Sequence, residues 1–187
     1  MSTKPLVSPS VPGLHVYLGI DLTCSERRPS ACALLDSAGR LAHLTAQSSN
    51  ADMLALSEEW RPTVVAIDSP LGFPKGMCCL EESCQCRSVH KFKGRVCERE
   101  LLGRGISLYI TTKRSFIKPM IYRAIDLARG LRSMGCEAME VYPYASKVGL
   151  FDKPIPPKNT RKGLEFLRRR LEWLIPSLAS YGDRLNH

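Results

Sequence analysis

Short runs of apolar residues alternate with polar connections along the chain, and this pattern predicts an α/β fold. The first three runs are rich in residues that favour β-strands and are separated by turn residues, which predicts an antiparallel meander. They comprise Leu14–Asp21, Ser30–Asp36 and Leu41–Ala46. Two later runs, Thr63–Asp68 and Cys136–Tyr142, predict a fourth and a fifth strand.

Apolar residues recur at helical spacing in segments that lie between and after these strands. The predicted helices cover residues 49–60, 96–102, 115–134 and 159–175. Ser115 is expected to cap the longest of them, and Pro176 is expected to end the last. Leucines form an apolar stripe on that last helix, so Arg168, Arg169 and Arg170 are expected to lie on its solvated face.

The order of these elements distinguishes between two α/β architectures. A helix precedes the fourth strand, so that strand is expected to run parallel to the first. Three antiparallel strands followed by two parallel ones is the connectivity of the ribonuclease H-like fold, a five-stranded mixed sheet in the order 3-2-1-4-5 flanked by helices. A flavodoxin-like fold would need a helix between the first two strands, and the segment between Asp21 and Ser30 is too short for one.

The composition is that of a basic globular protein. Its 187 residues fit one domain, expected over residues 14–187, after a flexible tail at 1–13 that lacks the apolar core of a signal peptide. No apolar run is long enough to cross a bilayer, so we expect a cytoplasmic protein with no membrane partner. Lys and Arg number 27 against 18 Asp and Glu, a net charge of +9. This surplus favours a polyanionic partner, DNA or RNA, although charge of this kind also serves solubility alone.

Carboxylates stand at the ends of strands that are expected to be neighbours. Asp21 closes the first strand and Asp68 the fourth, so adjacent parallel strands would bring both to one edge of the sheet. Glu140 lies in the fifth strand, beside them. Three carboxylates suit a site for Mg²⁺ or Mn²⁺ that promotes phosphoryl transfer. The structural alternatives are that the aspartates cap turns and that Glu140 forms a salt bridge at the surface.

An irregular loop at residues 69–95 follows Asp68 directly and is rich in Gly, Pro and Cys. Six candidate metal ligands lie in it and just after it: Cys78, Cys79, Cys84, Cys86, His90 and Cys97. Without an export signal, such cysteines favour reduced thiols or metal ligands over disulfides. They could form a tetrahedral Zn²⁺ site or hold an iron–sulfur cluster, and the alternative is a loop with incidental reduced thiols. In each case the loop is expected to shape access to Asp68.

Polar side chains near the carboxylates are candidate substrate ligands. They are Thr23, Ser69, Arg95, Glu98, Arg99, Lys113 and Arg114. Thr23 and Ser69 follow the two aspartates closely, and the cations would position a phosphate backbone. The aromatic residues interleaved with them, Phe92, Tyr109 and Phe116, could stack on bases, but we expect them to pack in the core instead.

Four of these segments in combination resemble a known family. They are Gly19–Thr23, Ala66–Pro74, Arg95–Leu101 followed by Gly103 and Gly105, and Glu140–Pro143. Together, over about residues 14–151, they are similar to the widespread uncharacterised-domain family described as predicted nucleases of ribonuclease H-like fold. The resemblance implies that Asp21, Asp68 and Glu140 bind the metal and that Arg95 and Glu98 belong to the same site.

The chain departs from that family at its end. Similar proteins continue beyond the basic helix into a last helix that carries another Asp, whereas this sequence stops at Asp183–His187. We therefore expect either a C-terminally truncated chain or a site without that carboxylate. Asp183 is not expected to replace it, because no helix-forming segment follows.

Three functions are compatible with these features. The first is a divalent-metal-dependent nuclease that hydrolyses phosphodiester bonds of nucleic acid, in which a metal-bound water attacks phosphorus. The second is a non-catalytic domain of the same fold that binds nucleic acid or a protein partner. The third is an actin-like Mg²⁺–nucleotide phosphohydrolase, in which a strand-end Asp and a following Thr contact the nucleotide, although its glycine-rich phosphate hairpins are absent. The sequence predicts no oligomeric state.

Overall fold

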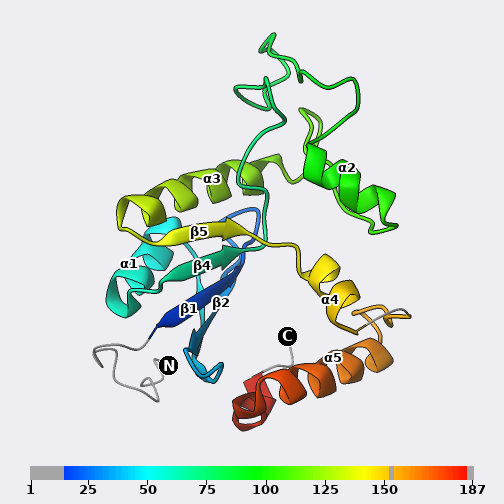
Figure 1. The fold of residues 1–187 in the computed structure, drawn as a ribbon. Helices are drawn as coiled ribbons and strands as arrows, with labels where there is room; N and C mark the ends of the chain where they lie inside the picture. The colour runs from blue at the N-terminus through cyan, green and yellow to red at the C-terminus, as the bar shows by residue number, and fades with distance from the viewer. Residues whose placement is uncertain (1–14, 152–153, 185–187) are drawn as a thin grey trace.

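A computed structural model describes residues 15–151 and 154–184, so the predicted tail at 1–13 lies outside the described part. Its centre is a five-stranded sheet in the order β3-β2-β1-β4-β5. The strands are β1 (Val16–Asp21), β2 (Ser30–Asp36), β3 (Leu41–Gln47), β4 (Val64–Ile67) and β5 (Glu137–Glu140). Strands β1 to β3 pair antiparallel, whereas β4 is parallel to both β1 and β5. The mixed sheet and its strand order confirm the predicted fold class (Figure 1).

The meander of β1 to β3 follows from alternation and from one turn. β1 buries every second residue from Val16 to Ile20, so one face of the strand meets the core. Asp36 ends β2, and its carboxylate accepts hydrogen bonds from the N–H groups of Ala38 and Arg40 at 2.9 Å each. These bonds close the turn that leads into β3.

Helices connect and follow the strands. In the described chain they are α1 (Asn50–Trp60), α2 (Val96–Gly103), α3 (Lys118–Ser133), α4 (Pro143–Phe151), α5 (Arg161–Leu174) and the 3-10 helix η1 (Pro176–Arg184). Ser49 begins α1 as predicted, in a capping box: its Oγ accepts from the N–H of Asp52, whose carboxylate accepts from the N–H of Ser49. None of the described helices is both long and apolar enough to cross a membrane.

The helices differ from the sequence prediction in three respects. α3 begins at Lys118 with Pro119 in its first turn, so the prediction that Ser115 caps it is wrong. Ser115 lies instead in a turn, where its N–H donates to the carbonyl of Thr112 at 3.1 Å. The apolar pattern did not predict α4, which begins at Pro143. Proline suits the first position of a helix, because the N–H that it lacks would have no partner within the helix there. Pro176 follows α5 as predicted but also begins η1.

The main core lies between the sheet and helices α1 and α3, which run side by side along one face (Figure 1). Leu18, Val65 and Ile67 of the central strands pack there with Met53 of α1 and Leu127 of α3. Because β1, β4 and β5 are parallel, their carboxyl ends reach the same edge of this sheet. That edge positions the candidate site.

The opposite face of the sheet is covered at its β3 side by the end of the described chain. Leu178 and Tyr181 of η1 pack on Leu41, the first residue of β3. The N–H of Leu41 also donates to Oγ of Ser177 at 2.7 Å. These contacts hold η1 against the meander.

α5 presents the face that the sequence predicted to be solvated. Arg168 and Arg169 are exposed and pair with glutamates one turn away on the same helix. Arg170 is also exposed, and its guanidinium lies over the rings of Phe151 and Phe166, 5.6 and 5.5 Å from their centres. Three leucines of the apolar stripe are themselves exposed, Leu164, Leu171 and Leu174, and the fourth, Leu167, is half-buried. α5 therefore adds little to the core.

Candidate functional site

Two aspartates lie at the same level of adjacent parallel strands. Ile20 pairs with Ile67 in the register of β1 and β4, and the N–H of Asp68 donates to the carbonyl of Ile20 at 2.9 Å. Asp21 and Asp68 come directly after these residues. Glu140 of β5 pairs with Ile67, one residue before that level. Since side chains alternate between the faces of a strand, the register directs Glu140 to the opposite face from the two aspartates.

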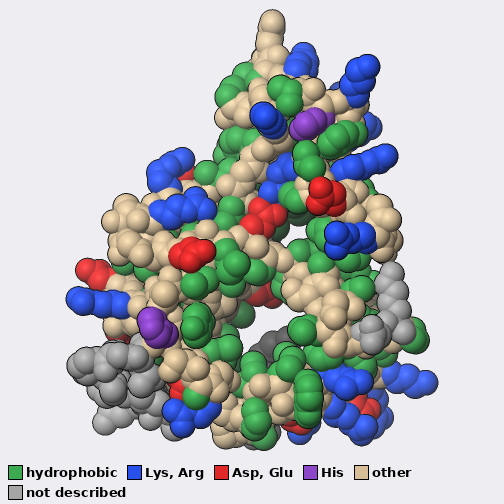
Figure 2. Space-filling model, viewed as in Figure 1, with side chains coloured by type: hydrophobic (Ala, Val, Ile, Leu, Met, Phe, Trp, Pro, Cys, Tyr) green, Lys and Arg blue, Asp and Glu red, His purple; other side chains and the backbone are tan. Residues whose placement is uncertain are grey.

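A cavity of about 1120 Å³ lies at this edge, and Figure 2 shows the surface hollowed between the sheet and the α4–α5 region. Its lining includes seven of the residues that the sequence predicted: Asp21, Asp68, Ser69, Arg95, Cys97, Glu98 and Glu140. Small-molecule sites commonly occupy about 300–1,000 Å³. The cavity is therefore large enough to admit part of a polymer.

Asp68 carries the clearest electrostatic signal in the cavity, because its pKa is raised to about 6. Burial is the largest cause, repulsion from Asp21 adds to it, and attraction to Lys158 opposes it. Asp21 therefore disfavours the charged form of Asp68. A divalent cation between them would offset that repulsion, so this pair suits a positively charged ligand.

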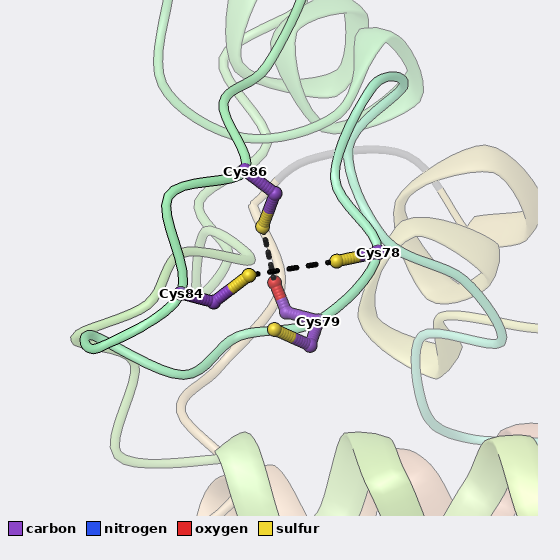
Figure 3. A group of neighbouring side chains, drawn as sticks. All are labelled: Cys78, Cys79, Cys84 and Cys86. Carbon is purple, nitrogen blue, oxygen red and sulfur yellow. Dashed lines mark hydrogen bonds between the residues drawn. The ribbon is translucent and has the colours of Figure 1, made fainter.

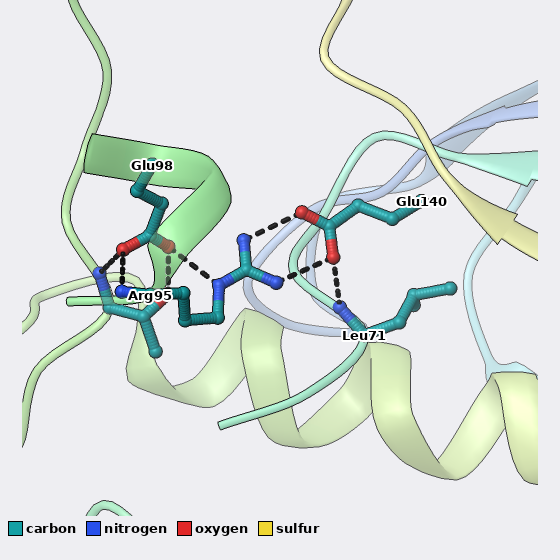
Figure 4. A network of polar contacts seen from close by, with 5 residues as sticks. Leu71, Arg95, Glu98 and Glu140 are labelled. Carbon is teal, nitrogen blue, oxygen red and sulfur yellow. Dashed lines mark hydrogen bonds and ion pairs between the residues drawn. The ribbon is translucent and has the colours of Figure 1, made fainter. Parts of the chain in front are cut away.

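Glu140 is held by an arginine rather than by the aspartates (Figure 4). Nη1 and Nη2 of Arg95 donate to its two carboxylate oxygens at 2.6 Å each, and the N–H of Leu71 donates to Oε2 at 2.9 Å. Bidentate pairs of this kind are strong and directional. Metal binding by Glu140 stays a prediction, since both of its oxygens already have partners in this structure.

Glu98 anchors that arginine from the protein interior. Its side chain is 1% exposed and accepts from N and Nε of Arg95 at 2.9 and 2.8 Å. It also accepts from N and Oγ1 of Thr111 at 3.0 and 2.5 Å. Burial would raise the pKa of Glu98, but these hydrogen bonds outweigh it and lower the pKa. Arg95 and Glu98, predicted as substrate ligands, thus build a charged and well-bonded wall of the cavity.

Gly94 allows this wall to form. Its φ of +87° lies in the left-handed region, which side chains other than glycine rarely adopt. A Cβ at this position would lie 2.5 Å from Oε2 of Glu98 and would also overlap Cγ2 of Ile110. Glycine therefore serves here both for its backbone conformation and for the close approach of Glu98.

Of the two predicted hydroxyl ligands, only Ser69 lines the cavity. Ser69 is buried, and its Oγ has no hydrogen-bond partner in the part of the chain that the structure describes. Buried hydroxyls are usually bonded, so this oxygen is available to a ligand. Oγ1 of Thr23 donates to the carbonyl of Arg28 at 2.6 Å, and Arg123 donates to both oxygens of Thr23. Thr23 therefore organises the β1–β2 connection, where its hydroxyl is already engaged.

The remaining predicted cations lie elsewhere. Nζ of Lys113 donates to the carbonyl of Cys84, and Arg114 forms an ion pair with Glu82 at 3.4 Å. Both lysine and arginine therefore contact the cysteine-rich loop. Arg99 is exposed on α2. The lining of the cavity, as far as the chain is described, includes none of these three cations.

Two lysines that the sequence did not single out line the cavity beside Asp68. Lys147 lies on α4 and Lys158 in the connection to α5. The pKa of Lys147 is lowered by burial and by repulsion from Lys158, so the two ammonium groups are close enough to influence each other. The missed helix α4 explains why Lys147 was not predicted. Pro143 followed by a helix-compatible segment was the only signal for that helix.

The prediction that Phe92, Tyr109 and Phe116 pack in the core is wrong: Phe92 is half-buried and stacks on His90, outside the core clusters. Tyr109 and Phe116 are 64% and 68% exposed. Their rings meet edge to face with centroids 4.7 Å apart, so they cover each other outside the core. Tyr109 also lines the cavity.

The cysteine-rich loop holds the one group of three or more His, Cys, Asp or Glu ligand atoms that lie within 4.8 Å of one another in residues 15–151 and 154–184. Its members are Cys78, Cys79, Cys84 and Cys86 (Figure 3). Such a group could hold a metal ion. His90 and Cys97, predicted with them, are not part of it: the His90 ring stacks on Phe92 at 4.9 Å, and Cys97 lines the cavity.

The four thiols differ in their surroundings. The hydrogen bond to Cys84 is the main cause that raises the pKa of Cys78 to about 12. Backbone hydrogen bonding at Cys79 is the main cause that lowers the pKa of Cys86 to about 6. A lowered pKa favours the thiolate, which is the form that ligates metals.

Comparisons of the chain with models of protein families, with curated proteins and with solved structures found no match. The likeness to known proteins therefore rests on the fold alone. A five-stranded mixed sheet in the order 3-2-1-4-5, with β4 parallel to both neighbours and helices flanking it, has the topology of the ribonuclease H-like fold. That topology is compatible with the nucleases of this superfamily, although a fold alone does not fix a function.

Proposed function

We propose that the chain is a divalent-metal-dependent nuclease that hydrolyses phosphodiester bonds of DNA or RNA. The observation that carries the proposal is the pair Asp21 and Asp68, which end adjacent parallel strands inside one large cavity. The raised pKa of Asp68 supports it, because the repulsion from Asp21 is the kind that a cation offsets.

In this proposal Asp21 and Asp68 hold Mg²⁺ or Mn²⁺, and Glu140 would be the third ligand, reaching the ion from the other face across the end of β4, since all three line the same cavity. Carboxylate oxygens are the ligands that these hard cations prefer. A divalent ion held there would acidify a water molecule and stabilise negative charge on a phosphoryl group. Each carboxylate oxygen has more than one lone pair, so Glu140 can contribute one while it remains paired with Arg95.

The chain's own polar groups would then bind and orient the phosphodiester. Lys158 repels Lys147 in the cavity, so an anion between them would favour the charged form of Lys147. The unpaired Oγ of Ser69 can donate to a phosphate oxygen beside Asp68. Arg95 is fixed by Glu98 and Glu140, which lets it present a constant charge without loss of side-chain entropy on binding.

The charge of the molecule supports a polyanionic substrate. The net charge of +9 favours nucleic acid through counterion release. Figure 2 shows Lys and Arg side chains around the projecting loop, where Arg87, Lys91 and Lys93 are exposed. Where one part of a nucleic-acid strand enters the cavity, these cations could therefore bind the part that remains outside, by contacts that do not depend on base sequence.

The test compares cleavage of single- and double-stranded DNA and RNA in Mn²⁺ or Mg²⁺ by the wild type and by Asp68→Asn. We expect cleavage by the wild type, and a loss of about 100-fold or more in the variant, because even groups that only orient metal ligands are worth 10- to 100-fold. Asp126→Asn, which removes an exposed carboxylate of α3, is the matched control and should cleave normally. Cleavage that persists in Asp68→Asn would contradict the mechanism.

A second function, a non-catalytic domain that binds nucleic acid or a protein partner, is favoured by one observation. The three carboxylates do not form a group of ligand atoms within 4.8 Å in the described chain, and Glu140 is occupied by Arg95. This alternative predicts salt-dependent binding of labelled nucleic acid that is the same in the wild type and in Asp68→Asn, without cleavage in any metal. The cleavage assay and a binding titration together separate the two functions.

A further inference from the structure

The segment that carries the four clustered cysteines is closed at its neck by main-chain contacts. The N–H of Val89 donates to the carbonyl of Lys75 at 2.9 Å. Gly76, at φ +91°, lets the two sides approach, since a Cβ there would lie 2.7 Å from Cγ1 of Val89 and 2.8 Å from the carbonyl of Arg87. The four cysteines between residues 78 and 86 thus lie in a loop whose two ends are held together at Lys75 and Val89.

This loop is anchored by the apolar residues Met77 and Leu80 near its start and projects beyond the sheet (Figure 1). Leu80 is wholly buried against Ile117 and Ile121 near the start of α3. Its N–H donates to the hydroxyl of Tyr122 at 2.7 Å. No residue from 81 to 93 is buried. Burial of apolar surface therefore cannot order this part of the loop, and another interaction must do so.

The sulfur positions fit a single tetrahedral ion. Sγ of Cys78 and Sγ of Cys84 are 3.6 Å apart, and all four sulfurs lie within 4.8 Å of one another (Figure 3). Zinc–sulfur bonds of about 2.3 Å in a tetrahedron place sulfurs roughly 3.8 Å apart. An iron–sulfur cluster attaches its thiolates to different iron ions and so spreads them further than one ion does. The compact group favours one ion over a cluster.

The charges around the group also suit zinc with four thiolates. Such a centre carries a net charge of −2, which nearby cations stabilise. Nη1 of Arg87 donates to the carbonyl of Cys86 at 3.0 Å and of Cys84 at 3.4 Å, and Nζ of Lys113 donates to the same carbonyl of Cys84. Bonds of this kind orient ligands around a metal.

We propose that Cys78, Cys79, Cys84 and Cys86 together bind one structural zinc ion, and that His90 and Cys97 do not. Four thiolates fill the coordination of zinc, so no open position remains for a substrate. The ion would fix the loop that leaves β4 beside Asp68 and returns to Arg95 at the start of α2. This proposal does not depend on the nuclease activity.

The primary test is the metal content of the full chain, purified with a thiol reductant and without chelators. We expect one zinc ion per chain in the wild type and in Asp68→Asn, His90→Ala and Cys97→Ser. In the presence of a competing chelator, each of the variants Cys78→Ser, Cys79→Ser, Cys84→Ser and Cys86→Ser should reduce bound zinc by about tenfold or more. Cys24→Ser is the matched control, because Cys24 is exposed and lies outside the loop.

A second measurement keeps the proposal testable if a cysteine variant does not fold. Apo protein prepared from the wild type is titrated with Co²⁺, and the visible spectrum should show tetrahedral coordination by four sulfurs at one equivalent. Absence of both zinc and that spectrum would overturn the proposal. So would stoichiometric iron with the absorption of an iron–sulfur cluster, zinc retained by one of the four variants, or zinc lost from His90→Ala or Cys97→Ser.

Discussion

The two regions where ligand atoms gather differ in how far the chain assembles them without a metal. In the loop, four sulfurs already lie within 4.8 Å of one another. At the carboxyl edge, Asp21 and Asp68 repel each other, and Glu140 is paired with Arg95. A closed group of thiolates suits a structural ion, whereas an incomplete group of carboxylates in a cavity suits an ion that also meets substrate. The same chain therefore presents one site suited to folding and one suited to chemistry.

The Arg95–Glu98 wall of the cavity gives the largest expected effect. Glu98→Gln removes the negative charge of the carboxylate that accepts hydrogen bonds from Arg95 and Thr111. It also places the amide N–H₂ of glutamine against the N–H donors of these two residues. Loss of one partner of a buried pair costs about 3–5 kcal/mol, so we expect the free energy of unfolding in urea to fall by about that amount.

Glu100→Gln is the control for that experiment, because Glu100 is exposed on the same helix. Its free energy of unfolding should change by less than about 0.5 kcal/mol. The folded fraction of Glu98→Gln should keep its zinc, because Glu98 makes no bond to the four cysteines. An equal effect of the two substitutions would show that the wall contributes nothing beyond an ordinary surface charge.

Gly94→Ala tests the same wall through the backbone. Alanine must adopt a positive φ and push its Cβ against Glu98 and Ile110, which we expect to cost about 2–3 kcal/mol of the free energy of unfolding. Gly103→Ala is the matched control, since a Cβ there meets nothing within 4 Å and its φ is not positive. Urea unfolding of both variants measures the difference. An unchanged free energy of unfolding in Gly94→Ala would mean that the backbone at this position can shift to accommodate a Cβ at little cost.

Asp68→Asn should stabilise the protein while it removes activity, which sets the carboxyl edge apart from the loop. The folded pKa of about 6 exceeds the ordinary value of 3.8, so the wild type loses stability as pH rises between these values. Asparagine has no such loss. Allowing for solvent screening of a half-buried group, we expect the variant to gain about 1–2 kcal/mol above about pH 6 and nothing below about pH 4.

That pH dependence is measured by urea unfolding of the wild type and the variant across the same range. Asp126→Asn should show no comparable difference from the wild type. Mg²⁺ should stabilise the wild type at neutral pH, by about 1.4 kcal/mol at ten times its dissociation constant, and should not stabilise Asp68→Asn. Equal stabilisation of both proteins by Mg²⁺ would place the cation elsewhere.

The smallest expected effect concerns the attachment of the loop. Tyr122→Phe removes the hydroxyl that bonds the N–H of Leu80, which costs about 1 kcal/mol and leaves the edge-to-face contact with Phe73 in place. Hydrogen exchange at Leu80 should become faster while exchange in β1 and β4 does not change. Tyr17→Phe, at an exposed position of β1, is the control. Unaltered exchange at Leu80 would mean that burial alone holds the loop.

The sheet could be predicted because its signals are local. Each strand is an apolar run, and the helix that ends at Trp60 requires the next strand to return parallel to the first. α4 was missed because Pro143 follows directly on a strand, where a proline predicts a break as readily as the first residue of a helix. The exposure of Tyr109 and Phe116 was missed because they contact each other in an irregular segment, where no helical or strand periodicity of apolar residues indicates which side chains are buried.

The candidate site was predictable only where it follows from strand ends. Asp21 and Asp68 share a level because β1 and β4 pair, which the strand order required. The pairing of Arg95 with Glu140 brings together residues separated by the whole of α2 and α3, and no spacing rule reports such a contact. Nor does spacing tell which four of six candidate ligands converge, because that depends on the turn that Gly76 permits.

The parallel pairing of β1 with β4 also sets the order in which the two regions can form as the chain folds. Asp21 meets Asp68 only after β2, β3 and α1 have been enclosed between them, a non-local contact that forms slowly. The four cysteines lie within one short segment and need only a local closure. If the proposed zinc site is correct, a newly made chain can capture its ion at the loop while the carboxyl edge is still unformed. A folding intermediate would then contain metal, and the carboxyl edge, with the activity proposed for it, would be among the last parts of the molecule to mature.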